Sequence, residues 1–154
     1  MAVSAELITE PDSFLTDAPV PHARLSEVLS RFSGDPRIGG VTSFAGLVRA
    51  DETPDGPVTA IDFSAHRSMA ERSLGELISR TAAAYESAVL RVYVEHALGT
   101  VPVGECPLVI VVGAGHRPEA FGLCRDILEA LKAEVPIYGK ELTGGGSHQW
   151  KVNR

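Results

Sequence analysis

Hydrophobic and polar positions along the first half of the chain predict a helix followed by two strands. Apolar residues at helical spacing predict a short helix over 23–33, which Gly34, Asp35 and Pro36 end. Successive residues over 38–49 alternate between two faces and include many small side chains, which predicts a strand that ends at Arg49. The same alternation predicts a further strand over 58–64. The polar, turn-rich segment 50–57 between these strands is expected to be an exposed loop.

The second half of the chain has the same mixture of spacings. The longest helix is expected from about residue 68 onwards, where Leu74, Leu77, Ile78, Thr81 and Tyr85 trace one helical face. Segments 88–97 and 106–115 are predicted to be paired strands, and the second of them is apolar enough to lie inside a sheet. The last helix is expected to start at Pro118 and to end before Pro136, with an apolar stripe formed by Ala120, Phe121, Cys124, Ile127, Leu128 and Leu131.

Length and composition indicate one globular domain over residues 1–154. The chain has 154 residues, of which 44% are hydrophobic and 22% charged, enough for a substantial core. No apolar run approaches the ~20 residues that span a bilayer, and the N-terminal segment lacks the pattern of an export signal. We therefore expect a single domain located in the cytoplasm, with no membrane partner.

Cysteine and glycine usage argues against a bound metal or cofactor. Cys106 and Cys124 are the two cysteines, and no pair of His or Cys residues has the spacing of metal ligands, so both thiols are expected to be buried. Gly144, Gly145 and Gly146 lack the lysine and hydroxyl spacing of a nucleotide-binding loop, so we expect them to connect a hairpin.

Cationic residues gather around the last predicted helix, between residues 115 and 140. His116 and Arg117 stand at its start, Arg125 and Lys132 on its polar side, and Lys140 just beyond. Because the whole chain has a formal net charge of -6, this cluster predicts a pocket for a small anion rather than a nucleic-acid surface. Unpaired N–H groups at the helix start favour an anion there. The purely structural alternative is that His116 caps the strand end and Arg117 pairs with Glu119 or another surface acid.

Five segments in order give the chain a resemblance to the large, catalytic subunit of molybdopterin synthase. They are VTSFAGLVR (41–49), FSAHRSMAERSL (63–74), HALGTVPVGE (96–105), GHRPEAF (115–121) and LKAEVPIYGKE (131–141), followed by Trp150. The resemblance implies an α+β fold of the hammerhead type, with a mainly antiparallel sheet, two longer helices and a short one. It also implies a homodimer that binds a small ubiquitin-like sulfur carrier with a Gly-Gly C-terminus. Sulfur from the carrier's thiocarboxylate would pass to a cyclic pyranopterin monophosphate and form the dithiolene of molybdopterin.

The same resemblance assigns roles to individual residues. It makes Lys132 and Lys140 catalytic, and Arg49, His116, Arg117 and Arg154 substrate-binding. In the family the second lysine follows directly after Pro-aromatic-aromatic, whereas here Gly139 intervenes before Lys140. A β-bulge at this point would return Lys140 to the pocket, where it would converge with Lys132; without one, Lys140 would point to the opposite face.

Three functions therefore remain open from the sequence. The first is the sulfurtransferase. The second is a non-catalytic paralogue that keeps the dimer and the groove for the carrier tail, and the third is an anion-binding structural protein unrelated to sulfur. Apolar residues in 41–49 and 107–112 exceed what one domain of this size easily covers, which favours a dimer interface.

Overall fold

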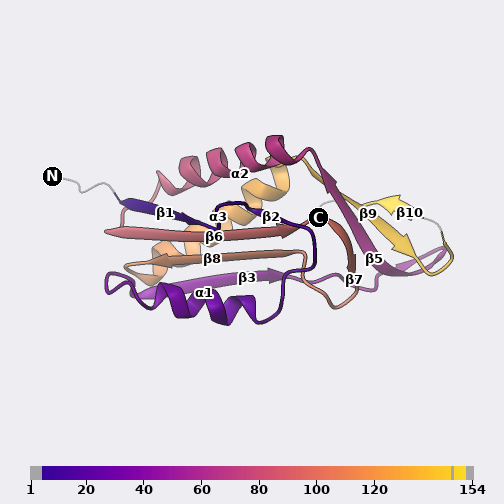
Figure 1. Cartoon of the computed structure of the whole chain (residues 1–154), viewed down its shortest axis with the longest axis horizontal. Coiled ribbons are helices and arrows are strands. Elements are labelled where there is room, and N and C mark those ends of the chain that lie inside the picture. Colours follow the sequence, from indigo (N-terminus) through magenta and orange to yellow (C-terminus); the bar gives the residue numbers. More distant parts are fainter. Residues whose placement is uncertain (1–4, 147, 152–154) are drawn as a thin grey trace.

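The computed structural model describes residues 5–146 and 148–151 and arranges them as two β-sheets with three helices (Figure 1). The larger sheet has the strand order β1-β6-β8-β3, and a short strand, β2, also pairs with β6. Its pairings are antiparallel except for β1 and β2, which run parallel to β6. The bounds are β1 (Glu6–Glu10), β2 (Leu15–Thr16), β3 (Gly40–Gly46), β6 (Val89–Ala97) and β8 (Leu108–Ala114).

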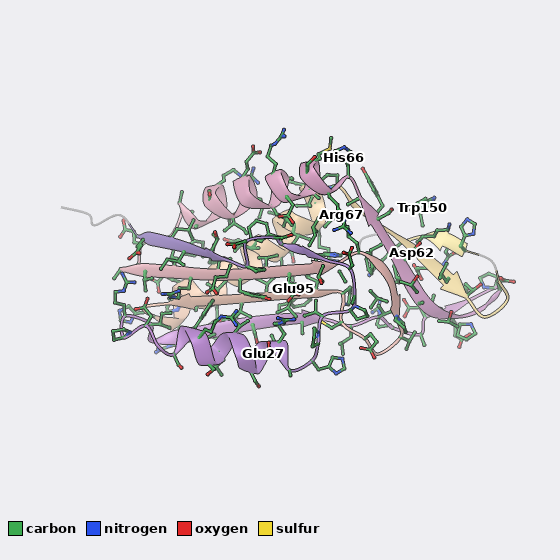
Figure 2. The ribbon with its side chains drawn as sticks, in the orientation of Figure 1. Glu27, Asp62, His66, Arg67, Glu95 and Trp150 are labelled. Carbon is green, nitrogen blue, oxygen red and sulfur yellow. The ribbon has the colours of Figure 1, made fainter. Side chains whose placement is uncertain are left out.

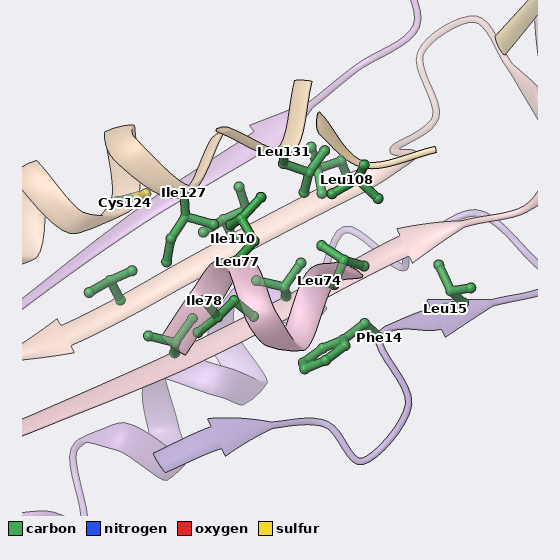
Figure 3. Packing of buried hydrophobic residues seen from close by; sticks show 14 of the residues in the cluster. Phe14, Leu15, Leu74, Leu77, Ile78, Leu108, Ile110, Cys124, Ile127 and Leu131 are labelled. Carbon is green, nitrogen blue, oxygen red and sulfur yellow. The ribbon is translucent and has the colours of Figure 1, made fainter. Parts of the chain in front are cut away.

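Helices cover both faces of the larger sheet. Helix α1 (Arg24–Phe32) lies on one face, while α2 (Arg67–Ala82) and α3 (Arg117–Glu134) lie on the other (Figure 1). Side chains alternate along β8, so Ile110 and Val112 belong to the cluster under α2 and α3, whereas Val109 and Val111 belong to the cluster under α1. Figure 3 shows the first cluster, in which Leu74 and Leu77 of α2 lie near Ile127 and Leu131 of α3.

The smaller sheet stands at one end of the larger one, beyond the end of β6 (Figure 1). Its order is β10-β9-β5-β4, and β7 also pairs with β5. The long strand β5 connects to α2, and the sharp turn from β6 into β7 passes through Gly99, whose φ of +90° favours glycine. The bounds are β4 (Glu52–Thr53), β5 (Gly56–Ala65), β7 (Gly99–Pro102), β9 (Ile137–Thr143) and β10 (His148–Trp150).

The structure confirms the α+β class, the short first helix and the pairing of β6 with β8. Both cysteines are buried, Cys124 in the cluster under α3 and Cys106 in the cluster under α1, as the sequence predicted. The glycine run does join the β9–β10 hairpin, where Gly146 has a φ of +84°. None of the described helices is long and apolar enough to cross a membrane.

Several expectations were wrong in detail. Helix α3, with 18 residues, is longer than α2, with 16, because α2 ends at Ala82 and Tyr85 lies beyond it. The strand 38–49 ends at Gly46, and part of the expected loop forms the β4–β5 hairpin. Phe121 is 63% exposed although it was placed in the apolar stripe. The strand around 107–112 is covered by the chain's own helices. Of the two apolar segments expected at a dimer interface, only the one that forms the edge strand β3 is therefore left for that role.

Candidate active site

A cavity of about 1100 Å³ lies where the two sheets and the C-terminal end of α3 meet. The end of β3, the end of β6 and the start of β8 contribute one side, and strands β5, β9 and β10 contribute the other. The volume is slightly above the range of about 300–1000 Å³ that is typical of small-molecule sites. Its charged lining residues are Arg49, Asp51, Glu52, Glu129, Lys132, Glu141 and Lys151.

Arg49 and Lys132, predicted from distant parts of the sequence, line this one cavity. Arg49 follows the end of β3, and the backbone of its neighbour Val48 is held by hydrogen bonds with Glu105 and Gly104, at 3.1 and 2.9 Å. The Arg49 guanidinium pairs with Asp51 at 3.2 Å and stays exposed. Lys132 lies in the last turn of α3, open to solvent on one side. Desolvation by the cavity wall, together with the positive charge of Lys151, lowers the pKa of Lys132.

His96, at the end of β6, forms part of the floor of the cavity. The imidazole is 3% exposed and packs edge-on against the Phe63 ring, with the ring centroids 5.1 Å apart. Burial lowers its pKa to about 4, and the charges of Lys132 and Lys151 act in the same direction, so the ring is neutral at pH 7. Nδ1 lies 2.8 Å from the Ala97 carbonyl oxygen and must therefore carry the proton, which leaves Nε2 as an acceptor.

His116 and Arg117 are not in the cavity. Both are exposed at the start of α3, whereas Lys132 is in its last turn, and fifteen helical rises separate Arg117 from Lys132 by about 22 Å. In the described part of the chain no ion pair joins Arg117 to Glu119 or to another acid, so the structural alternative for Arg117 is not seen. One chain therefore presents two separate cationic positions at opposite ends of one helix.

Lys140 also lies apart from Lys132, because β9 has no bulge at Gly139. The pairing with β5 runs regularly from Ile137 to Leu142, and the register shift occurs further along, between Val58 and Ala60. Gly139 packs on Ile61 and Phe63, the side of β9 that faces the cavity. Lys140 therefore points to the other face, opposite Asp62, and among the described residues it lines neither cavity. Figure 2 shows Asp62 and Trp150 on the smaller sheet.

A second cavity, of about 370 Å³, adjoins the first. The two share a wall formed by Phe63, His96, Lys132, Ala133, Trp150 and Lys151. His96 and Lys151 were missed from the sequence as site residues. The available signal for His96 was its place on the apolar face of β6, where it continues the alternate positions Leu90, Val92 and Val94. Nothing local indicated that the tail would return Lys151 to this wall. Arg154 lies outside the described residues, and no cluster of metal-binding side chains is found among those described.

Comparison with solved structures identifies the class of fold. The molybdopterin synthase structure from Staphylococcus aureus superposes with a TM-score of 0.80 at 21% identity, covering 94% of this chain and 99% of that one. A complex of subunits 1 and 2 of molybdopterin-converting factor from Helicobacter pylori gives a TM-score of 0.73 at 15% identity, covering 99% of this chain and 92% of that one. At these identities the likeness shows the fold alone, an α+β architecture.

Sequence comparison then gives the family: residues 15–134 match the MoaE protein family, and the chain belongs to it. Molybdopterin synthase catalytic subunit 1 from Mycobacterium tuberculosis is 38% identical over 140 residues, which covers 91% of this chain and 90% of that protein. A molybdopterin synthase catalytic subunit from Nostoc is 33% identical, covering 90% of this chain and 81% of the relative. A probable molybdopterin synthase from Haloferax volcanii is 36% identical over 131 residues, and there the match spans only 49% of the relative's length.

Proposed function

We propose that this chain is the catalytic subunit of a molybdopterin synthase. It accepts sulfur from the C-terminal thiocarboxylate of a small ubiquitin-like carrier and transfers it to a cyclic pyranopterin monophosphate, in the cytoplasm. The observation that carries the proposal is that Arg49 and Lys132, 83 positions apart in the sequence, line one cavity in a member of the MoaE family. Relatives over most of the chain's length are named molybdopterin synthase catalytic subunits.

The chemistry needs three things that cations supply. The substrate phosphate must be held, the thiocarboxylate must be positioned, and the negative charge that develops on its acyl oxygen must be stabilised. Arg49 offers forked donors suited to an anion, and Lys132 offers an ammonium with a lowered pKa at the cavity wall. The neutral His96 adds a buried acceptor, and the sulfur arrives on the carrier, so neither buried cysteine is required.

The separation of about 22 Å along α3 supports a homodimer. If His116 and Arg117 contact the same small substrate as Lys132, they must come from a second copy of the chain, since one rigid helix holds them apart. The exposed start of α3 and the edge strand β3 are available for such an assembly. Sedimentation at micromolar concentration tests this part, and a monomer under those conditions would remove it.

A non-catalytic paralogue is the second candidate, because Gly139 places no side chain at the cavity and Lys140 points away from it. Mixing the purified chain with thiocarboxylated carrier and pterin monophosphate separates the candidates. Formation of molybdopterin supports the enzyme, and carrier binding without product supports the paralogue. If neither occurs, the chain is an anion-binding protein unrelated to sulfur transfer.

A further inference from the structure

Lys151 lies beside Gly139 of β9. Gly139 lines the smaller cavity but has no side chain to extend into it. The backbone N–H of Lys151 donates to the Gly139 carbonyl oxygen at 2.8 Å, so the position of this residue is fixed by the β9–β10 hairpin. A Cβ built on Gly139 would lie 3.1 Å from Ile61 and 3.2 Å from Phe63, tighter than an ordinary contact. The side chains of Ile61 and Phe63, on the neighbouring strand β5, therefore fill the space beside Gly139.

The shared wall of the two cavities holds Lys132 and Lys151 together with the neutral His96. The carboxylates lie elsewhere: Glu134 lines only the smaller cavity, and the larger one alone is lined by Asp51, Glu52, Glu129 and Glu141. The Arg49 guanidinium, on the larger cavity, is already paired with Asp51. The shared wall is thus lined by both lysine side chains and by His96, whereas each of these carboxylates lines one of the two cavities.

We propose that Lys151 supplies the second ammonium group of the active site. Gly139 has no side chain that could supply it, and Lys140 faces away from the cavity. The proposal deepens the sulfurtransferase function proposed above and rests on it. Two ammonium groups on one wall attract an anionic group of the substrate or of the carrier tail. Each also disfavours the protonated form of its neighbours, which agrees with the effect of Lys151 on the pKa of both Lys132 and His96.

The first test needs no activity. Lys151→Gln removes one positive charge just after β10 and Lys140→Gln removes one from the neighbouring strand β9, so they form a matched pair. We expect an NMR titration of His96 to give a higher pKa in Lys151→Gln, because a repelling charge is lost, and an unchanged pKa in Lys140→Gln. A His96 pKa that does not respond to Lys151→Gln, or responds equally to both variants, would overturn the placement of Lys151 at the wall.

The second test uses the complete reaction with thiocarboxylated carrier and pterin monophosphate. Lys151→Gln should lower turnover by at least on the order of 10-fold, less than for a fully enclosed donor because Lys151 is exposed, and Lys151→Arg should restore part of it. Lys140→Gln should stay near the wild-type rate. Wild-type turnover in Lys151→Gln, or a loss confined to Lys140→Gln, refutes the proposal. An inactive wild-type protein would instead refute the sulfurtransferase function, and the His96 titration would still decide where Lys151 lies.

Discussion

Acidification should destabilise this protein through His96, and the structure sets the range. A buried imidazole whose pKa falls from 6.5 to about 4 on folding is neutral in both states above pH 6.5. As the pH falls below 6.5, the unfolded chain takes up a proton that the folded chain refuses until about pH 4. The unfolded state is therefore favoured progressively between these two values, and stability is lost in that window.

The expected loss follows from the width of this window. Each pH unit below 6.5 costs about 1.4 kcal/mol until the native pKa is approached, so the loss is about 2 kcal/mol by about pH 5. Asp35 acts at lower pH, because its hydrogen bonds with Arg37 hold its pKa far below the ordinary value of 3.8; the stability it contributes is present above that value and is lost only as the pH falls below it. Measurements that stop at about pH 5 therefore isolate the histidine.

Urea unfolding at several values between about pH 7.5 and about pH 5 measures this, with His96→Asn as the reference. The asparagine amide can donate to the Ala97 carbonyl in place of Nδ1 and does not titrate. We expect the wild type to lose about 2 kcal/mol more than the variant over this range. Equal losses in the two proteins would mean that His96 takes up its proton in the folded state as readily as in the unfolded one. Its Nε2 would then not be an acceptor on the cavity wall at mildly acidic pH.

Three further predictions concern the site and the backbone. Lys132→Ala should lower turnover on the order of 10²-fold in a steady-state assay while circular dichroism remains unchanged, and an unaltered rate in folded protein would remove Lys132 from the mechanism. Arg117→Ala should weaken binding of the pterin monophosphate in calorimetry without loss of stability, since its side chain is exposed; equal affinity would sink its assignment to the phosphate. Gly39→Ala would bring its Cβ to 2.3 Å from the Gly115 carbonyl oxygen and should cost about 1–3 kcal/mol in urea unfolding. Gly46→Ala, whose nearest contact would be 3.6 Å, is its control, and the two should differ clearly.

The core of the fold was accessible from the sequence because its signals are local. Alternation along 88–97 and the apolar run after Cys106 are properties of single segments, and both became central strands. Phe121 illustrates the limit: its spacing matched the apolar stripe, but whether a residue at the border of a stripe is covered depends on which elements pack nearby. The length of α2 was overestimated for a related reason, because Tyr85 lies beyond the helix although its spacing continues the helical face.

The site was predictable only in part, because strand orientation depends on a partner that spacing cannot reveal. Arg49 and Lys132 were found through motifs, and the cavity brings them together. Whether Lys140 faced the cavity depended on the register of β9 against β5, and the register shift lies at Val58 and Ala60 rather than at Gly139. Lys151 is brought to the wall by the β9–β10 hairpin, through its backbone hydrogen bond to Gly139, and the residues next to Lys151 in the sequence do not indicate that contact.

The burial of the two thiols affects how this protein can react with a sulfur-carrying partner. Cys124 and Cys106 lie on opposite faces of the larger sheet, and burial raises the pKa of each, to about 11 for Cys124. Neither is present as a ready thiolate, so a thiocarboxylate carrier meets no thiolate from these cysteines that could attack its acyl carbon, form a thioester and release the sulfur as hydrosulfide. An electrophilic label would likewise modify each cysteine only when its own layer of helices lifts from the sheet.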